Sequence, residues 1–373
     1  MIALGPAIGR LELAPLAGRE WYRSLCEKLV PQLGEETYLV VAVVGGTNIG
    51  KSVIFNHIAD ARLSATSPLA SGTRHPVCVM PENFVSRHDL AAIFPGFELS
   101  PWATADDSLV DRAEDRIYWR TAKETPPNLL ILDTPDIDSD VQVNWRRADA
   151  VRRVADVLIA VLTQQKYNDA AVKRYFRNAA EEGKVVLVIF NQCQLPDDEA
   201  YWPLWLETFC RETGVAPRLV YVAPNDRRAA EEGRLPFFEK SNLRVSSGPV
   251  SQSNRLAAGE NGGVSSSESS EKPRRLADDL SDLKFAEIKL TTLTGSLRHL
   301  MDVDGGLPAF LREIEGWSAA FESAAKWLSS ESVIKVRNWP TIPNALLVAE
   351  IRTWWRQRQH GLARRVHEFY DTV

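Results

Sequence analysis

The chain has 373 residues, a net charge of −5 and an apolar content of 45%. That apolar content excludes a wholly disordered chain, and the acidic balance argues against a general nucleic-acid coat or a strongly basic membrane-binding surface. The longest apolar runs have the length of strands, so no transmembrane helix is expected.

The cysteines show no paired spacing along the sequence. They are Cys26, Cys78, Cys193 and Cys210. We expect thiols in a reducing compartment rather than disulfides or zinc ligands. The expected location is therefore the cytoplasm, with association to a membrane surface left open.

The first predicted element is a helix within residues 1–36. Trp21, Leu25, Leu29 and Leu33 recur at four-residue steps and form an apolar stripe. A helix with one apolar face needs a partner. We expect helices from the C-terminal part of the chain to provide it.

Six apolar runs then predict strands, and helix-length segments separate most of them. Most runs are continuous rather than alternating, which is typical of a parallel sheet buried on both faces. This order predicts an α/β fold, a three-layer domain over residues 37–240 with a mostly parallel six-stranded sheet. The predicted strands are 38–44, 76–80, 129–133, 157–163, 185–190 and 219–223, and the predicted helices are 51–60, 143–155, 169–182 and 198–213.

Three segments lie outside this alternation. Residues 81–128 contain prolines, tryptophans and acids, and we expect an elaborated loop with a helix over 109–122. Serine and glycine clusters predict a flexible linker over 241–275. Residues 276–373 return to helical spacing and predict an all-helical bundle with the N-terminal helix, although the first of these helices could instead complete the α/β domain.

Residues 45–52 follow the pattern G-x-x-x-x-G-K-[ST]. A buried-strand composition precedes the pattern and helical spacing follows it, so backbone N–H groups and a helix N-terminus should point at one place. Such a place attracts a polyphosphate, and both flanks argue against a chance match in a glycine-rich turn. The predicted binding residues are Gly45, Gly46, Thr47, Asn48, Ile49, Gly50, Lys51 and Ser52.

Four side chains are candidates for phosphate and metal chemistry. Lys51 is expected to reach the β- and γ-phosphates, and Ser52 to place its hydroxyl on Mg²⁺. Asp133 ends an apolar strand and can hold the same ion through water, the alternative being a turn or helix-cap aspartate. Thr73, in the loop before the second strand, can close on Mg²⁺ and the γ-phosphate, the alternative being an ordinary loop residue.

These motifs resemble those of the translation-factor-related P-loop GTPases over residues 38–225. The Asn-Ile-Gly-Lys-Ser run at 48–52 is similar to Era-type GTPases, and Thr-Arg-His-Pro at 73–76 is similar to the switch I signature of dynamin-like proteins. Asp-Thr-Pro at 133–135 resembles the start of their phosphate-sensing turn. The resemblance implies GTP and GDP as ligands, Mg²⁺ as cofactor, and a helical bundle beside the G domain.

Two departures from the family pattern bear on affinity and specificity. The phosphate-sensing turn usually ends in glycine, whereas this chain has Asp136, whose carboxylate could repel a γ-phosphate. The guanine-reading motif keeps Asn191, but Gln192 and Gln194 replace the usual lysine and aspartate. An ionised acceptor is lost at Gln194, so we expect a relaxed or weak guanine preference.

The resemblance also bears on hydrolysis. Ile137 occupies the position where Ras-type proteins hold a water-orienting glutamine, and isoleucine cannot orient water. Relatives with an apolar residue there use a potassium ion, a partner subunit or both, which implies Asn48 as a K⁺ ligand that joins Lys51 and Thr73 in catalysis. The alternative, in which Asn48 only stabilises the tight turn, stays open.

The sequence therefore predicts a switch that binds and slowly hydrolyses GTP, couples its state to a helical effector module, and forms a homodimer through the nucleotide face. Two alternatives remain: a hydrolysis-poor nucleotide-binding interaction protein, and an NTPase of relaxed specificity that also accepts ATP. Tryptophans and arginines over 354–365 could face ribosomal or other RNA or an anionic membrane surface. A solvated basic helix face is the commoner origin of such a pattern.

Overall fold

The computed structural model describes residues 15–31, 38–66, 72–110, 112–123, 125–126, 128–139, 141–240, 272–329 and 343–358. The chain forms two compact units, Met1–Leu311 and Arg312–Val373. The predicted linker falls almost entirely outside the described residues, which resume at 272.

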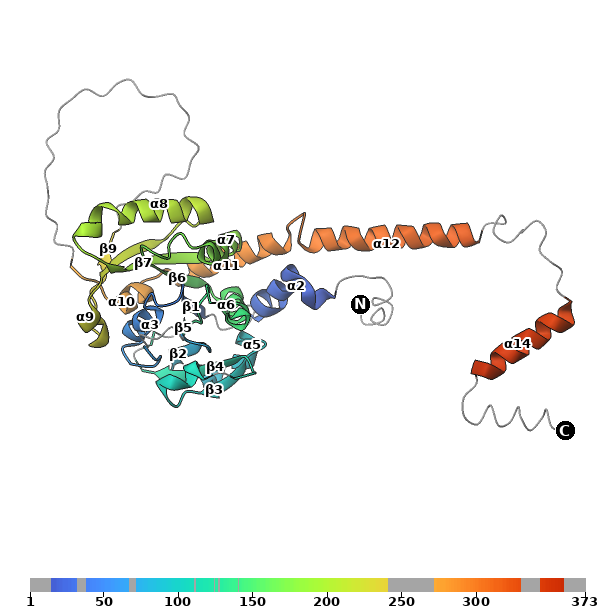
Figure 1. Ribbon diagram of the computed structural model, residues 1–373, viewed down its shortest axis with the longest axis horizontal. Helices are drawn as coiled ribbons and strands as arrows, with labels where there is room; N and C mark the ends of the chain where they lie inside the picture. Colours follow the sequence, from blue (N-terminus) through green and yellow to red (C-terminus); the bar gives the residue numbers. More distant parts are fainter. Residues whose placement is uncertain are drawn as a thin grey trace, which may run out of the picture. The chain divides into compact units, whose positions relative to one another are not determined.

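A mixed sheet forms the centre of the first unit (Figure 1). Its strands are β1 (Leu39–Val44), β2 (Val77–Pro81), β3 (Glu98–Pro101), β4 (Arg116–Ala122), β5 (Leu129–Asp133), β6 (Val157–Leu162), β7 (Val185–Cys193), β8 (Leu219–Pro224) and β9 (Phe238–Glu239). They lie in the order β3-β4-β2-β5-β1-β6-β7-β8-β9. All neighbours are parallel except β2 with β5 and β8 with β9. The six predicted strands are all present, but the sheet has nine strands rather than six.

The helix predicted over 109–122 is wrong, because residues 116–122 form β4. This segment, Arg-Ile-Tyr-Trp-Arg-Thr-Ala, is rich in the aromatic and β-branched residues that favour strands. It pairs in parallel with β2 on one side and β3 on the other. Backbone partners from separate parts of the chain thus decide its conformation.

Side chains alternate across β1 and build the three predicted layers. Val40, Ala42 and Val44 face the apolar cluster that α6, α7 and α8 complete, whereas the odd-numbered residues face the cluster that α3, α10 and α11 complete. The helices are α3 (Lys51–Ala59), α6 (Gln142–Val154), α7 (Ala170–Glu181), α8 (Trp202–Thr213), α10 (Leu276–Ser281) and α11 (Phe285–Leu300). Shorter helical segments are α4 (Phe84–Arg87), α5 (Leu90–Ile93), η5 (Ala105–Leu109), η6 (Asp197–Ala200) and α9 (Arg227–Glu231).

Helices from the two ends of the first unit pack together. The N-terminal elements are η2 (Leu16–Gly18), α2 (Glu20–Ser24) and the π-helical η3 (Leu25–Leu29), and the next helix after α11 is α12 (Leu307–Leu328). Trp21 and Leu29 form a buried apolar cluster with Leu300 and Phe310. The N-terminal helical elements therefore contact the end of α11 and the first turn of α12, whereas Leu33 of the predicted apolar stripe lies outside the described residues.

A buried polar cluster ties these helices to the sheet. Asp156, immediately before β6, accepts hydrogen bonds from Val40 N at 3.0 Å, Lys28 Nζ at 2.5 Å, Lys289 Nζ at 3.0 Å and Thr292 Oγ1 at 3.2 Å. Burial alone would raise the pKa of Asp156, but the two lysine charges outweigh it and lower the pKa to about 2. We call Lys28, Asp156 and Lys289 the lysine–aspartate cluster.

The second unit contains the rest of α12 and α14 (Asn344–Arg358). Trp354 and Trp355 are half exposed, and the Arg358 guanidinium lies 4.3 Å from the ring centroid of Trp354. The helical spacing predicted over 276–373 continues beyond Arg358 into residues outside the described part of the chain. Among the described helices, none combines the length and apolar character needed to cross a membrane.

Candidate nucleotide-binding site

The P-loop leaves the sheet beside the end of β5. The parallel register sets Val43 of β1 opposite Asp133, and α3 begins at Lys51. Gly50 has a φ of 89°, a left-handed conformation that favours glycine. Asn48 takes the same region with a φ of 60°, which asparagine adopts more readily than most residues. Strand, loop and helix follow one another as the motif predicts.

Lys51 is held by two acceptors. Its Nζ donates to the Gly46 carbonyl oxygen at 2.6 Å and forms an ion pair with Asp136. Both charged side chains are buried, with exposed fractions of 5% and 7%. Asp136 is therefore already paired with the ammonium group that is expected to bind phosphate, in addition to its expected position near the γ-phosphate.

Three oxygen-bearing side chains meet beside Lys51. Ser52 Oγ donates to Asp133 Oδ2 at 2.7 Å and lies 3.2 Å from Thr73 Oγ1, which itself lies 3.3 Å from Asp133 Oδ2. Ser64 Oγ, which the sequence analysis missed, donates to the same carboxylate oxygen at 2.6 Å. Burial raises the pKa of Asp133, against the hydrogen bonds from Ser64 and Ser52 that favour its charged form.

The donor set fits a magnesium ion. Oδ1 of Asp133 is buried and has no hydrogen-bond partner among the described residues. Mg²⁺ prefers oxygen ligands and is often bound by one or two carboxylates together with substrate phosphates. Ser52, Thr73 and Asp133 would hold the ion, which would neutralise phosphate charge when bound.

A second carboxylate, Asp138, binds the P-loop from the turn after β5. It accepts hydrogen bonds from Thr47 N at 2.7 Å and Thr47 Oγ1 at 2.8 Å, and it pairs with Lys166. Burial would raise the pKa of Asp138, but the Lys166 and Thr47 hydrogen bonds outweigh it and lower the pKa. The sequence analysis missed Asp138, although its position two residues after Asp136 was an available signal.

Ile137 faces the core rather than the cavity. Its side chain is 4% exposed and belongs to the same apolar cluster as Val44. Its backbone N–H donates to the Gly45 carbonyl oxygen at 3.3 Å. The role of position 137 in hydrolysis stays a prediction.

The loop expected to read the base contacts the P-loop from the end of β7. Asn191 Nδ2 donates to the Ile49 carbonyl oxygen at 2.7 Å, and Gln192 Nε2 donates to the Asn48 carbonyl oxygen at 3.1 Å. Gln194 is exposed, and its backbone N–H donates to Asp198 Oδ2 at 2.7 Å. The structure thus brings Asn191 to the site but not the Gln194 side chain.

Several of the predicted residues line a cavity of about 970 Å³. Its lining includes Asn48, Gly50, Lys51 and Ser52 of the P-loop, Thr73, Asp136, the Asn191–Gln192 pair and residues 224–227. Gln194 and the fully buried Asp133 are not among the lining residues. The volume lies at the upper end of the range for small-molecule sites.

Residues 40–192 match the model of the family described as "50S ribosome-binding GTPase". This segment is a P-loop GTPase domain. A comparison of the sequence with curated proteins gave no match.

Solved structures similar to the chain include two of Era. The structure of Era with MgGDPNP and nucleotides 1506–1542 of 16S ribosomal RNA is 16% identical, with a TM-score of 0.32, and the match covers 51% of this chain and 52% of that one. Aquifex aeolicus Era bound to GDP·AlF₄⁻ is 14% identical, with a TM-score of 0.31 and coverage of 51% and 52%. The chain spans about half the length of each.

A third similar structure is that of an oligomerised bacterial dynamin pair, described as a mechanism for the long-range sensing and tethering of membranes. It is 13% identical, with a TM-score of 0.39, and the match covers 95% of this chain and 50% of that one.

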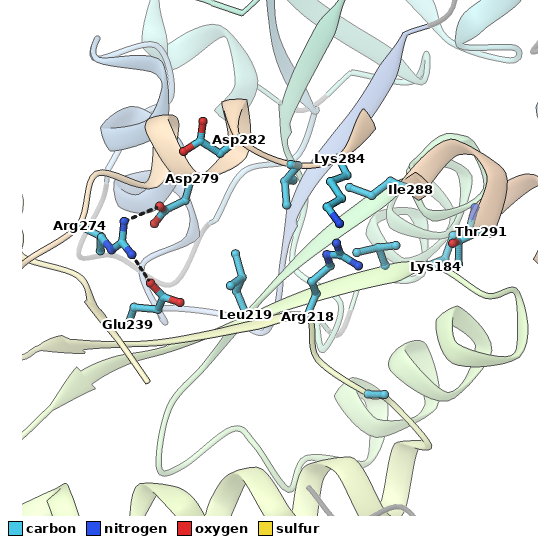
Figure 2. A pocket seen from close by; sticks show the side chains of 13 residues that line it. Lys184, Arg218, Leu219, Glu239, Arg274, Asp279, Asp282, Lys284, Ile288 and Thr291 are labelled. Carbon is cyan, nitrogen blue, oxygen red and sulfur yellow. Dashed lines mark ion pairs between the residues drawn. The ribbon is translucent and has the colours of Figure 1, made fainter. Parts of the chain in front are cut away.

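A second cavity, of about 790 Å³, lies away from the P-loop of the GTPase domain, between α10, α11 and strands β7 and β8 (Figure 2). Several of its charged groups have partners. Arg274 pairs with Glu239 at 2.9 Å and Asp279 at 3.5 Å, and Arg218 pairs with Glu287 at 2.9 Å.

Proposed function

We propose that this chain is a nucleotide-dependent switch that binds guanine nucleotides with Mg²⁺ and hydrolyses GTP slowly. The observation that carries the proposal is that Lys51, Ser52 and Thr73 line one cavity while Ser52 and Thr73 both lie within hydrogen-bond distance of the buried Asp133 carboxylate. Lys51 would bind the β- and γ-phosphates, and the three oxygen-bearing side chains would hold the ion. Ile137, buried in the core, supports a low intrinsic rate because no residue at its position orients water.

We propose that the helical elements move in response to the nucleotide bound to the GTPase domain. The lysine–aspartate cluster contacts Val40 near the start of β1, and β1 runs directly into the P-loop. A displacement of the P-loop would therefore be transmitted through β1 and the Asp156 carboxylate to Lys28 of η3 and Lys289 of α11.

We further propose that two GTPase domains meet through the nucleotide face and that Asn48 holds a potassium ion there. Asn48 is exposed and lines the cavity, and its side chain makes no hydrogen bond within the described part of the chain. Its left-handed backbone fits the alternative role in the turn equally well. A hydrolysis rate that changes with neither potassium concentration nor protein concentration would contradict both the proposed dimer and the proposed potassium ion.

The experiment that tests the proposed function is a comparison of affinities for GTP, GDP, ATP and ADP in the presence of Mg²⁺, followed by turnover of the nucleotides that bind. Guanine nucleotide binding with slow turnover is the expected result. Binding without turnover would favour the hydrolysis-poor alternative, and equal use of ATP would favour the relaxed-specificity alternative. No association with any of the four would overturn the proposal.

The Lys51–Asp136 ion pair is the observation that favours the hydrolysis-poor alternative. A triphosphate must displace a buried carboxylate from Lys51 and then lie beside that carboxylate. Both effects disfavour the triphosphate more than the diphosphate, because the γ-phosphate carries the additional charge.

We expect Asp136→Asn to raise the affinity for a non-hydrolysable GTP analogue about tenfold relative to GDP. Asparagine keeps the shape of the side chain but removes its charge, which frees Lys51 and relieves repulsion worth about 1–2 kcal/mol. Titration of fluorescent nucleotides measures both affinities. Asp106→Asn, at an exposed carboxylate outside the cavity lining, is the matched control. Equal changes for the two nucleotides would reject the competition.

Gln194→Asp is expected to raise the preference for GTP over ATP about tenfold, since an ionised acceptor for guanine N–H groups is worth about 1.5–3 kcal/mol. Competition between the two nucleotides for one fluorescent probe measures the preference. An unchanged ratio would place base recognition at residues of the cavity lining rather than at position 194, and Asn225→Ala would then be the next variant to compare.

A further inference from the structure

Arg147 of α6 is a buried cation with four hydrogen bonds, and the expected nucleotide chemistry does not use it. Its side chain is 2% exposed. Nε donates to Asp115 Oδ1 at 2.8 Å, and Nη1 donates to the Arg74 carbonyl oxygen at 2.9 Å. Nη2 donates to the carbonyl oxygens of Arg112 at 3.3 Å and Glu114 at 3.2 Å. A guanidinium presents its donors in a fixed fork, so these acceptors are held in one arrangement.

The Arg74 carbonyl belongs to the segment that carries Thr73. On the other side of that peptide segment, the backbone N–H groups of Arg74 and His75 both donate to the Ser108 carbonyl oxygen, at 2.9 Å and 3.0 Å. The residue after Thr73 is therefore fixed through both its carbonyl and its N–H group. Thr73 has little freedom to move away from Ser52 and Asp133.

His75 adds a further contact between this segment and the sheet. Its Nδ1 accepts a hydrogen bond from the backbone N–H of Arg116, the first residue of β4, at 3.3 Å. The residue that follows Arg74 is thus also held in place.

α6 is also the helix that follows the turn from Asp133 to Asp138. The same rigid element thus lies directly after the turn that contains Asp136 and reaches back to the Thr73 segment. A movement of α6 would shift the Arg74 carbonyl, and with it the position of the Thr73 hydroxyl.

We propose that Arg147 is a positioning residue that fixes the Thr73 hydroxyl beside Ser52 and Asp133 and thereby sets the magnesium dependence of nucleotide binding. This inference rests on the proposed function. It assigns to Arg147 no contact with nucleotide or ion, and its effect is carried entirely through the Arg74 carbonyl. Residues that orient metal ligands from outside the coordination sphere change metal affinity about 10–100-fold when they are replaced.

The test measures binding of a fluorescent GTP analogue as Mg²⁺ is titrated from chelated to millimolar levels. Arg147→Lys and Arg147→Gln are each expected to raise the Mg²⁺ concentration for half-maximal gain in affinity about tenfold. Binding in the presence of chelator should be unchanged, because Lys51 and the P-loop amides do not contact Arg147. Amide hydrogen exchange of residues 72–75, measured without nucleotide, should become faster in both variants.

Arg146→Gln is the matched control. Arg146 is the adjacent residue on α6, is 70% exposed and pairs with the same Asp115 at 3.5 Å. Thr73→Ala should reproduce the shift in Mg²⁺ response, and adding Arg147→Lys to it should change nothing more.

The outcomes separate the two proposals. If the wild-type chain responds to Mg²⁺ and Arg147→Lys, folded by circular dichroism, responds identically, the positioning role of Arg147 is overturned while the proposed function stands. A wild-type chain that binds nucleotide with no response to Mg²⁺ would overturn the metal site itself, and with it both proposals.

Discussion

Asp156→Asn is expected to lower the free energy of unfolding by about 3–5 kcal/mol, because it leaves the charges of Lys28 and Lys289 buried without a counter-ion. Both lysines are almost fully buried, with exposed fractions of 1% and 5%. Lys28 Nζ also donates to the Val154 carbonyl oxygen, and Lys289 Nζ to that of Tyr38, but these carbonyls carry no net charge. The midpoint of urea unfolding measures the loss.

Two comparisons isolate the cause. Asp149→Asn removes a carboxylate that is 43% exposed and pairs with Arg152 at 3.3 Å, and it should cost less than about 1 kcal/mol. A triple variant with Lys28→Met, Asp156→Leu and Lys289→Met should recover most of the lost stability, because it removes the buried charges altogether. A small loss in Asp156→Asn alone would mean that the lysines are neutral in the folded chain.

The same cluster predicts an acid transition. The pKa of Asp156, about 2 in the folded chain, lies below its ordinary value of about 3.9. The stability that Asp156 contributes through this shift is therefore fully present well above about pH 4, and it is lost as the pH falls from about 4 to about 2.

Lys51→Ala is expected to reduce nucleotide affinity and turnover by at least about 100-fold. Truncating one partner of a buried, hydrogen-bonded charge pair costs about 2–5 kcal/mol, and here the loss has two parts. The phosphates lose their ammonium partner, and Asp136 remains buried beside them with its charge unpaired. Calorimetry with GTP and GDP, combined with a turnover assay, measures the loss.

The second part of that loss can be recovered separately. Adding Asp136→Asn to Lys51→Ala should restore about tenfold of the affinity, because it removes the repulsion without replacing the lysine. Lys173→Ala, at a lysine of α7 that pairs with Glu212 at 2.8 Å, is the control for loss of a lysine elsewhere in the domain. Wild-type affinity in Lys51→Ala would show that the phosphates bind somewhere other than this loop.

Local composition was sufficient for the central features of the GTPase domain. Each predicted strand is an apolar run whose side chains are buried on both faces of a sheet. This burial does not depend on which strand lies alongside. The P-loop was equally local, because its eight-residue motif contains both Gly50, with its left-handed conformation, and Lys51, where α3 begins. Asp133 could be singled out because it ends such a run.

The error at residues 109–122 has the opposite origin. β4 has only half-buried residues at several positions, so its periodicity carries a weak signal, and its two strand neighbours come from residues 77–81 and 98–101. Strand formation there depends on hydrogen bonds to backbone far away in sequence, which no local pattern records.

By itself, the sequence identified the groups that the structure brings together beside the P-loop: one ammonium group, two hydroxyls and one carboxylate, on Lys51, Ser52, Thr73 and Asp133. Only the tertiary structure decided which partners these groups and their loops have. Lys51 forms an ion pair with Asp136, Asp138 accepts a hydrogen bond from Thr47 N, and Arg147 donates a hydrogen bond to the Arg74 carbonyl oxygen. These contacts join residues 73 to 91 positions apart. A charged side chain can pair with any opposite charge or carbonyl that folding brings near, so its partner is set by how the elements pack rather than by the residues beside it in the chain.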